Sequence, residues 1–221
     1  MIGAQLPLAV QLREAASFDN FHAGPNREAI EALRTLPGNV LLFGPPGCGK
    51  THLLQAQARA SGATYLPLRE LHAHGTEALE GHDAAAALCL DDIDAVATDL
   101  PWCVALLRLL DIRRTAGARC VISAAAPPER LELALPDLRT RLAACAVFGL
   151  RMLDDADRAA LLQSGAQARG IEMPVDVARW LLATQARDPG RLLEALDRLD
   201  RASLSLKRKL TLPFAQSVLW R

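Results

Sequence analysis

The sequence lacks long hydrophobic runs, and it has no excess of charge of either sign. Its longest uninterrupted apolar stretch, Ala84 to Leu90, is far below the roughly 20 residues that a membrane-spanning helix requires. The first fifteen residues contain one basic residue, Arg13, and no apolar core of a signal peptide. The chain balances 25 Lys and Arg against 25 Asp and Glu, whereas a protein that coats DNA needs a basic excess to displace counterions. We therefore expect a cytoplasmic protein that is neither bound to a membrane nor a nonspecific DNA binder.

Metal-binding patterns and lysines are scarce as well. The five cysteines form no CxxC motif and lie near no pair of histidines at ligand spacing, which argues against a zinc site and a disulfide framework. Only three of the 25 basic residues are lysines, and Lys50 is the one that precedes residue 207. A lysine this isolated invites a functional reason.

Five near-continuous apolar runs, at 39–43, 63–68, 87–92, 120–124 and 145–150, are typical of buried parallel strands. Helical periodicity fills most of the gaps between them, which predicts an α/β fold with a five-stranded parallel sheet. After residue 150 the strand signal stops.

Three helices are predicted in the remaining sequence, over 154–168, 174–185 and 189–201, each with Asp or Pro near its start. The sequence therefore predicts three parts. These are an extended arm over 1–12, an α/β core over 13–150 and a small all-α domain over 151–221.

A phosphate-binding motif follows the first predicted strand. Gly44 to Thr51 reads Gly-Pro-Pro-Gly-Cys-Gly-Lys-Thr and matches G-x-x-x-x-G-K-[ST] in the strand-loop-helix context that the motif requires. In such a loop the backbone N–H groups surround the β-phosphate, and the helix N-terminus adds positive potential. Lys50 reaches the β- and γ-phosphate oxygens, and Thr51 binds Mg²⁺. The motif predicts that the protein binds ATP or ADP with Mg²⁺.

The third predicted strand ends in acidic residues, as a Walker B element does. The run from Leu88 to Asp94 reads Leu-Cys-Leu-Asp-Asp-Ile-Asp. Asp91 is expected to hold Mg²⁺ through water, and Asp92 stands where the hydrolytic base orients the attacking water. Many such ATPases have Glu at the second position. Because Asp92 is shorter, we expect slow intrinsic hydrolysis.

These elements, followed by a helical domain, together resemble the AAA+ ATPases, whose P-loop core is followed by a helical lid. The segment Phe-Asp-Asn-Phe-His-Ala-Gly-Pro-Asn at 18–26 resembles the adenine-side segment of the bacterial replication initiator DnaA and its relatives. Three further segments, at 135–142, 196–203 and 208–214, resemble the Hda family, the shorter regulatory paralogues of DnaA. The resemblance covers nearly the whole chain. An initiator carries a helix-turn-helix DNA-binding domain after its lid, and residues 210–221 leave no room for one, so we do not expect a complete initiator.

The resemblance assigns residues of the P-loop, of the adenine-side segment and of the lid to the nucleotide. They are Phe18, Asn26, Gly44, Pro45, Pro46, Gly47, Cys48, Gly49, Lys50, Thr51, His52 and Arg191, the last at the sensor 2 position. At the sensor 1 position the chain departs from its relatives. Ala125 and Ala126 stand where an acidic or polar residue and an Arg are common, and Ser123 is the polar group nearby. This departure favours a stably nucleotide-bound, ADP-holding regulatory subunit over a fast motor.

The resemblance also implies a mechanism that acts in trans. In such relatives the DNA-loaded sliding clamp, the beta subunit of DNA polymerase III, recruits the paralogue, whose arginine finger promotes hydrolysis of the ATP bound to DnaA and so prevents re-initiation. Arg141 falls at the finger position of Leu-Pro-Asp-Leu-Arg-Thr-Arg-Leu, with Arg139 two residues away as a competitor. A guanidinium there stabilises the charge on the transferring phosphoryl group, an effect worth about 10³ to 10⁵ in rate.

The N-terminal arm contains the segment that resembles a clamp-binding peptide. Gln5 is expected to enter a polar subsite, and Leu6 and Leu8 to fill an apolar groove, with Ala9 in place of the usual bulky residue. DNA would then be reached mainly through the clamp, which makes the protein nucleoid-associated.

Two other functions stay open at this point. The chain is alternatively a self-sufficient AAA+ ATPase, such as a helicase loader or remodeller, or a nucleotide-bound adaptor that promotes no hydrolysis. The sequence also leaves open whether the protein forms a homo-oligomer.

Overall fold

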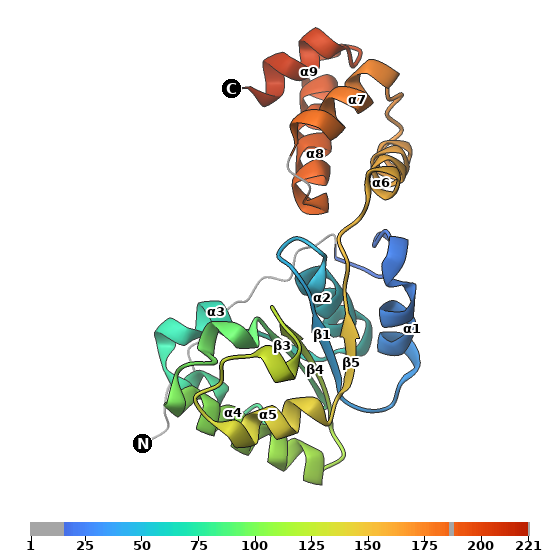
Figure 1. The fold of residues 1–221 in the computed structure, drawn as a ribbon. Helices are drawn as coiled ribbons and strands as arrows, with labels where there is room; N and C mark the ends of the chain where they lie inside the picture. Colours follow the sequence, from blue (N-terminus) through green and yellow to red (C-terminus); the bar gives the residue numbers. More distant parts are fainter. Residues whose placement is uncertain (1–15, 186–187, 221) are drawn as a thin grey trace. The chain divides into compact units, whose positions relative to one another are not determined.

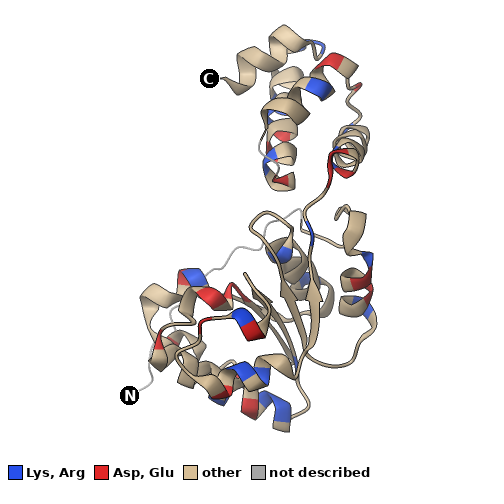
Figure 2. Ribbon diagram, in the orientation of Figure 1, with Lys and Arg blue, Asp and Glu red and all other residues tan. Residues whose placement is uncertain are grey.

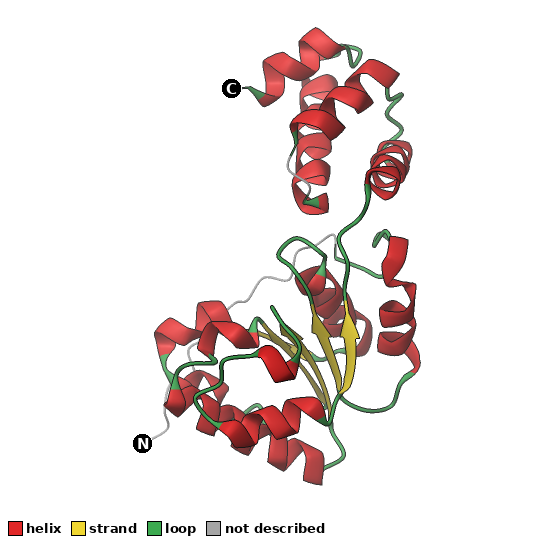
Figure 3. Cartoon of the chain, viewed as in Figure 1, coloured by secondary structure: helices red, strands yellow, loops and turns green. Residues whose placement is uncertain are grey.

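The computed structural model describes residues 16–185 and 188–220, and their contacts divide them into two compact units. The first unit contains Arg27–Gly44, Lys50–Gly149 and the described residues before His22. The second contains His22–Asn26, Pro45–Gly49 and the described residues from Leu150 onward. The predicted fold class, a five-stranded parallel sheet followed by an all-helical domain, is confirmed (Figures 1 and 3).

The sheet has five parallel strands in the order β2-β3-β4-β1-β5. Their bounds are β1 Val40–Phe43, β2 Thr64–Pro67, β3 Ala87–Asp91, β4 Arg119–Ala124 and β5 Ala146–Gly149, each within two residues of its predicted range. Because neighbouring strands run in the same direction, the segments that follow β1, β3 and β4 meet at one edge of the sheet. Ligands of open α/β sheets bind at this carboxyl edge.

The helices of the first unit are α1 Arg27–Thr35, α2 Lys50–Ser61, α3 Leu68–Leu71, α4 Leu100–Thr115 and α5 Pro136–Ala143. Short 3-10 turns at His72–His74, Thr76–Leu79, Ile93–Val96 and Pro128–Arg130 join them, and a further one, Gly24–Asn26, belongs to the second unit. Helix α4 packs on β4 and on α5, and α2 packs on β2, β3 and β4. Figure 2 shows that the strands carry almost no charge, as the burial of β1 to β4 requires.

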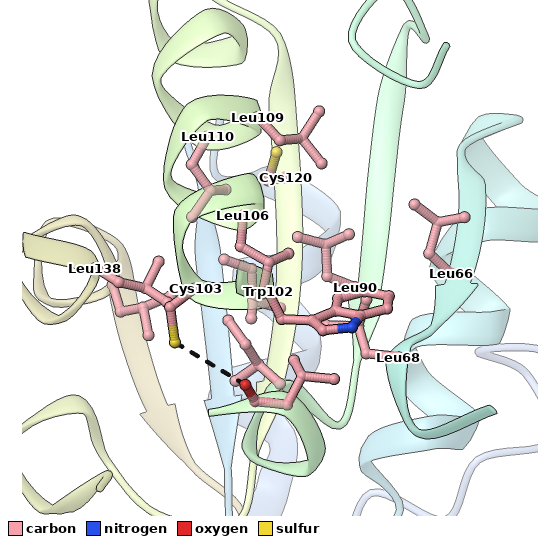
Figure 4. Packing of buried hydrophobic residues seen from close by; sticks show 14 of the residues in the cluster. Leu66, Leu68, Leu90, Trp102, Cys103, Leu106, Leu109, Leu110, Cys120 and Leu138 are labelled. Atoms are coloured by element: carbon pink, nitrogen blue, oxygen red, sulfur yellow. Dashed lines mark hydrogen bonds between the residues drawn. The ribbon is translucent and has the colours of Figure 1, made fainter. Parts of the chain in front are cut away.

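One core cluster lies between the sheet and helix α4 (Figure 4). Leu90 of β3 and Ile122 of β4 pack there with Leu106 of α4, all of them fully buried. Cys103 lies in the same cluster, and its Sγ donates to the Ala97 carbonyl oxygen at 3.0 Å. Burial raises the pKa of the Cys103 thiol, so this cysteine acts as a protonated, apolar side chain.

The second unit contains four helices with a core of their own. These are α6 Asp155–Ala168, α7 Val175–Thr184, α8 Pro189–Leu206 and α9 Leu212–Leu219. The predicted start signals are used, since Asp154 caps α6 by accepting from the Asp157 N–H at 2.8 Å.

Two features of this unit differ from the prediction. Helix α8 continues five residues beyond 201, and α9 was not predicted. An eight-residue helix is too short to be stable alone. Helix α9 depends on Phe214 and Ala215, which are buried among α6, α7 and α8.

Within these described ranges, none of the helices combines the length and the apolar character that crossing a bilayer requires.

Candidate nucleotide-binding site

The phosphate loop joins β1 to α2, and its backbone takes conformations that need glycine. Gly47 has φ 81° and Gly49 has φ 100°, values at which a Cβ atom would strain the chain. Helix α2 begins at Lys50, directly after the loop. The N-terminus of a helix thus follows the glycine-rich loop in the chain, the order of elements that is typical of anion-binding loops.

Lys50 is buried, with 8% of its surface exposed. Its Nζ donates a hydrogen bond to the Gly44 carbonyl oxygen at 2.7 Å. A buried ammonium is costly without such an acceptor, and a phosphate oxygen is a stronger, charged acceptor for the same donor. The Gly44 carbonyl therefore satisfies the Lys50 ammonium, and a bound phosphate would replace or join this carbonyl as an acceptor.

The carboxylate of Asp91, the last residue of β3, is fixed by both neighbouring strands. The Tyr65 hydroxyl on β2 donates to Oδ2 at 2.6 Å, and the Ser123 hydroxyl on β4 donates to Oδ1. Strand register explains both contacts. Tyr65 pairs with Cys89, two residues before Asp91 on the same side, and the Ile122–Leu90 pair immediately precedes Ser123 and Asp91.

Tyr65 serves Asp91 as a permanent donor. Burial raises the pKa of Tyr65, and the negative charge of Asp91 raises it further. The hydroxyl therefore stays protonated at neutral pH, and the carboxylate stays oriented. A carboxylate has about four lone-pair sites, so each oxygen of Asp91 retains capacity after these two bonds.

This donor set fits Mg²⁺ bound together with a nucleotide. Magnesium sites in such enzymes use one or two carboxylates plus the phosphates and water rather than a cage of protein ligands. Within residues 16–185 and 188–220, no three His, Cys, Asp or Glu side chains form a group that could hold a metal. Asp91 and the hydroxyl of Thr51, in the first turn of α2, are the residues that would hold the ion.

Asp92 lies at the predicted position of the hydrolytic base, but its carboxylate is engaged. Its backbone is left-handed, with φ 56° and ψ 53°, and its N–H donates to the Ser123 Oγ at 2.8 Å. Its Oδ2 accepts from Arg69 Nε at 2.9 Å, while Arg69 Nη2 lies 3.5 Å from Asp94 Oδ2. The Arg69 guanidinium thus pairs with the carboxylate that would orient water. This pairing is a second reason, besides the short Asp side chain, to expect slow intrinsic hydrolysis.

Ser123 connects the acidic residues at the carboxyl end of β3. Its hydroxyl accepts from the Asp92 N–H and donates to Asp91, so it links the two acidic positions. The neighbouring Ala125 contributes through its backbone, since its N–H donates to Asp94 Oδ1 at 2.8 Å. The structure therefore brings Asp91, Asp92 and Ser123 together as one hydrogen-bonded group.

The adenine-side segment is held by the start of α2 and by α1. His52 Nε2 hydrogen-bonds the Ser17 carbonyl oxygen at 2.9 Å, and its ring lies 5.3 Å from that of Phe21. The Arg34 guanidinium lies 5.1 Å above the ring of Phe18. His52 therefore joins this segment to the helix that follows the phosphate loop.

Asn26 fixes the chain where β5 leads toward α6. Its Nδ2 donates to the Arg151 carbonyl oxygen at 3.0 Å, and its Oδ1 accepts from the Arg151 N–H at 2.8 Å. Since Asn26 is 3% exposed, these two bonds satisfy a buried amide.

The two candidate arginine fingers on α5 differ in what holds them. Arg139 Nη2 donates to the Leu131 carbonyl oxygen at 3.1 Å, which ties this side chain to the preceding loop. Arg141 Nε donates to Asp111 Oδ1 on α4 at 2.5 Å, and a third of the Arg141 side chain is exposed. Arg141 is thus held through Nε, whereas Arg139 is held through Nη2.

Four further predicted residues belong to the second unit or to the N-terminal arm. Arg191 is exposed in the first turn of α8, in the second unit. Gln5, Leu6 and Leu8 of the arm lie outside the described residues.

Sequence reasoning missed Tyr65 and Arg69. Tyr65 carried a usable signal, because it is the one tyrosine of the sequence and lies in a predicted buried strand, where a hydroxyl needs a partner. Arg69 carried none, since it is one of 22 arginines.

Residues 40–150, half of the chain, match the family described as ATPase family associated with various cellular activities (AAA). The chain therefore belongs to the AAA family, whose core binds nucleotides. Residues 155–219 match the lid domain of Hda. The helical domain of this chain is thus similar to the Hda lid.

Solved structures agree on the fold. Domain III of Thermotoga maritima DnaA superposes with a TM-score of 0.77 at 20% identity, over 95% of this chain and 98% of that one. The AMPPCP-bound DnaA of Aquifex aeolicus gives 0.71 at 21% identity, over 87% and 67%. The RuvB Holliday junction branch migration motor of Thermotoga maritima gives 0.65 at 18% identity, over 95% and 73%.

Proposed function

We propose that this Hda-type protein, while bound to adenine nucleotide and tethered to the DNA-loaded sliding clamp, stimulates hydrolysis of the ATP bound to DnaA. Arg141 acts as the arginine finger in trans, and the consequence is that a fired initiator does not restart replication. The partners are therefore DnaA and the beta clamp, with DNA reached through the clamp.

The state of Arg141 carries this proposal. Among the residues that the structure describes, its two Nη nitrogens make no hydrogen bond, while Nε is anchored on Asp111. The Nη edge is the part of a guanidinium that matches the oxygens of a phosphoryl group. An anchored arginine with an open edge is suited to stabilising the charge that develops on another subunit's γ-phosphate.

The contacts of Asp91 and Asp92 support a role in which this chain holds nucleotide while DnaA carries the ATP that is hydrolysed. Lys50, Thr51 and Asp91 are suited to holding nucleotide and Mg²⁺, whereas the pairing of Asp92 with Arg69 leaves the water-orienting group occupied. The bound nucleotide, which we take to be ADP in the working state, thus has a structural role, and its hydrolysis does not power the protein.

Single-turnover hydrolysis of ATP prebound to DnaA tests the proposal. We expect this protein to accelerate hydrolysis when clamp loaded on DNA is present, and to do so much less without the clamp. No acceleration under the complete conditions would refute the proposal. Rapid steady-state turnover by the protein alone would instead favour a self-sufficient ATPase.

Removing Arg69 is expected to raise the intrinsic ATPase. Arg69→Ala frees the Asp92 carboxylate to orient water, and we expect an increase of about three- to tenfold in slow hydrolysis by the protein alone, a small part of a general-base contribution. The Arg69 side chain is 62% exposed, so the free energy of unfolding should change by less than about 1 kcal/mol. Steady-state phosphate release measures the rate.

The matched control for this change is Arg69→Ala with Asp92→Asn. The double variant should lose the gain, because the freed group no longer carries a charge. A gain that survives Asp92→Asn would mean that Arg69 acts through another group.

The arm is expected to supply the clamp contact. Gln5→Ala with Leu6→Ala removes one polar and one apolar anchor of the peptide, and interface anchors of this kind each account for about 1 to 2 kcal/mol or more. We expect clamp capture in a pulldown to fall at least tenfold while ADP affinity, measured by calorimetry, stays unchanged. Undiminished clamp capture would reject the assignment of the arm.

A further inference from the structure

Helix α4 carries an acidic residue that reaches across to the arginine-finger helix. Asp111 lies near the end of α4, which packs against α5. Its Oδ1 accepts the hydrogen bond from Arg141 Nε and lies 3.8 Å from Arg114 Nε. One carboxylate thus lies between two guanidinium groups, and the group of three carries a net positive charge.

The way in which Arg141 is held differs from that of a structural arginine in the same chain. Arg169 in the lid uses all three nitrogens. Its Nε and Nη2 lie 2.8 Å and 2.6 Å from Asp197 Oδ1, and its Nη1 donates to the Gly165 carbonyl oxygen at 2.7 Å. Arg141 donates through Nε alone among the described residues. The Asp111 contact therefore fixes the plane of the guanidinium but leaves its two-pronged end unpaired.

We propose that Asp111 is a positioning residue for Arg141, which sets the guanidinium so that its Nη groups meet the γ-phosphate of the ATP held by a partner subunit. This inference rests on the proposed function of Arg141 as the finger. A free arginine side chain samples many rotamers, and anchoring Nε before the encounter removes most of that freedom. The adjacent Arg114 offsets the negative charge that Asp111 brings near the phosphate.

A contact that held the finger back would have the opposite consequence. In that case Asp111 would compete with the phosphate for Arg141, and removing the carboxylate would speed the reaction. The observed contact leaves both Nη groups available, so it favours positioning over sequestration.

The test measures the rate at which DnaA-bound ATP is hydrolysed in a single turnover, with clamp-loaded DNA and increasing amounts of the full-length protein. Asp111→Ala should lower the maximal stimulated rate about tenfold and leave the concentration for half-maximal stimulation unchanged. Asp111→Asn should recover much of the loss, because its amide oxygen still accepts from Nε. Asp197→Ala, which removes an ion pair of similar exposure in the lid, is the matched control and should behave as the unmodified protein.

The double variant separates positioning from a merely structural role. Adding Asp111→Ala to Arg141→Ala should cause no further loss of the stimulated rate. The single variant Asp111→Ala should have the same melting temperature as Asp111→Asn. An unchanged or raised maximal rate for Asp111→Ala, while Arg141→Ala is inactive, would overturn the positioning role and leave the finger intact. Full activity of Arg141→Ala would instead overturn the finger and, with it, the role of Asp111.

Discussion

Lys50→Ala is expected to weaken ADP and ATP binding by about 100-fold. The change removes a buried ammonium whose Nζ is held 2.7 Å from the carbonyl oxygen of Gly44, the first residue of the phosphate-loop motif. A hydrogen bond between charged partners contributes about 1.5 to 3 kcal/mol, and every 1.4 kcal/mol is a tenfold change in Kd. Isothermal titration calorimetry of nucleotide-free protein measures the loss.

Lys209→Ala is the matched control, because Lys209 is an exposed lysine of the second unit. It should bind nucleotide as the unmodified protein does. Thermal unfolding provides a second readout, since a ligand at 100 times its Kd stabilises the fold by about 2.7 kcal/mol, and Lys50→Ala should lose this shift. Tight ADP binding by Lys50→Ala would mean that the loop from Gly44 to Thr51 is not the nucleotide site.

The parts of the fold that depend on local patterns were predictable. The buried strands β1 to β4 appear as uninterrupted apolar runs, and the partly exposed β5 keeps such a run, so all five were found. The phosphate loop is encoded by contiguous residues. Helix α9 was missed because its stability comes from Phe214 and Ala215 packing on helices distant in sequence. A sequence pattern indicates the periodicity of a helix, but it does not indicate which distant residues the helix packs against.

The contacts that tune the candidate site were not predictable, because they join residues far apart in the chain. Tyr65 reaches Asp91 across 26 positions, and Arg141 reaches Asp111 across 30. Each depends on strand register or on helix packing that the sequence does not state. The residue types of the site could therefore be proposed from motifs, whereas the partners that orient Asp91, occupy Asp92 and anchor Arg141 required the structure.

Arg141→Ala is expected to lower the stimulated hydrolysis of DnaA-bound ATP by about 10³-fold, near the lower end of the effect of an arginine finger. This corresponds to about 4 kcal/mol of transition-state stabilisation. The reason is the open Nη edge, which is suited to hydrogen-bonding the phosphoryl oxygens as their charge grows. Single-turnover measurements with clamp-loaded DNA give the rate, and clamp capture and ADP affinity should remain unchanged.

Arg139→Ala distinguishes the finger from its neighbour on the same helix. Arg139 is committed to the Leu131 carbonyl oxygen, so its loss should affect the packing of the loop before α5 and reduce the stimulated rate far less than Arg141→Ala. Arg141→Lys should also remain strongly impaired, because a lysine keeps the charge but offers no planar fork for two phosphoryl oxygens. If Arg139→Ala abolished stimulation while Arg141→Ala retained it, the finger would be Arg139, whose guanidinium the structure ties to the Leu131 carbonyl oxygen. That result would require this tie to break when DnaA binds.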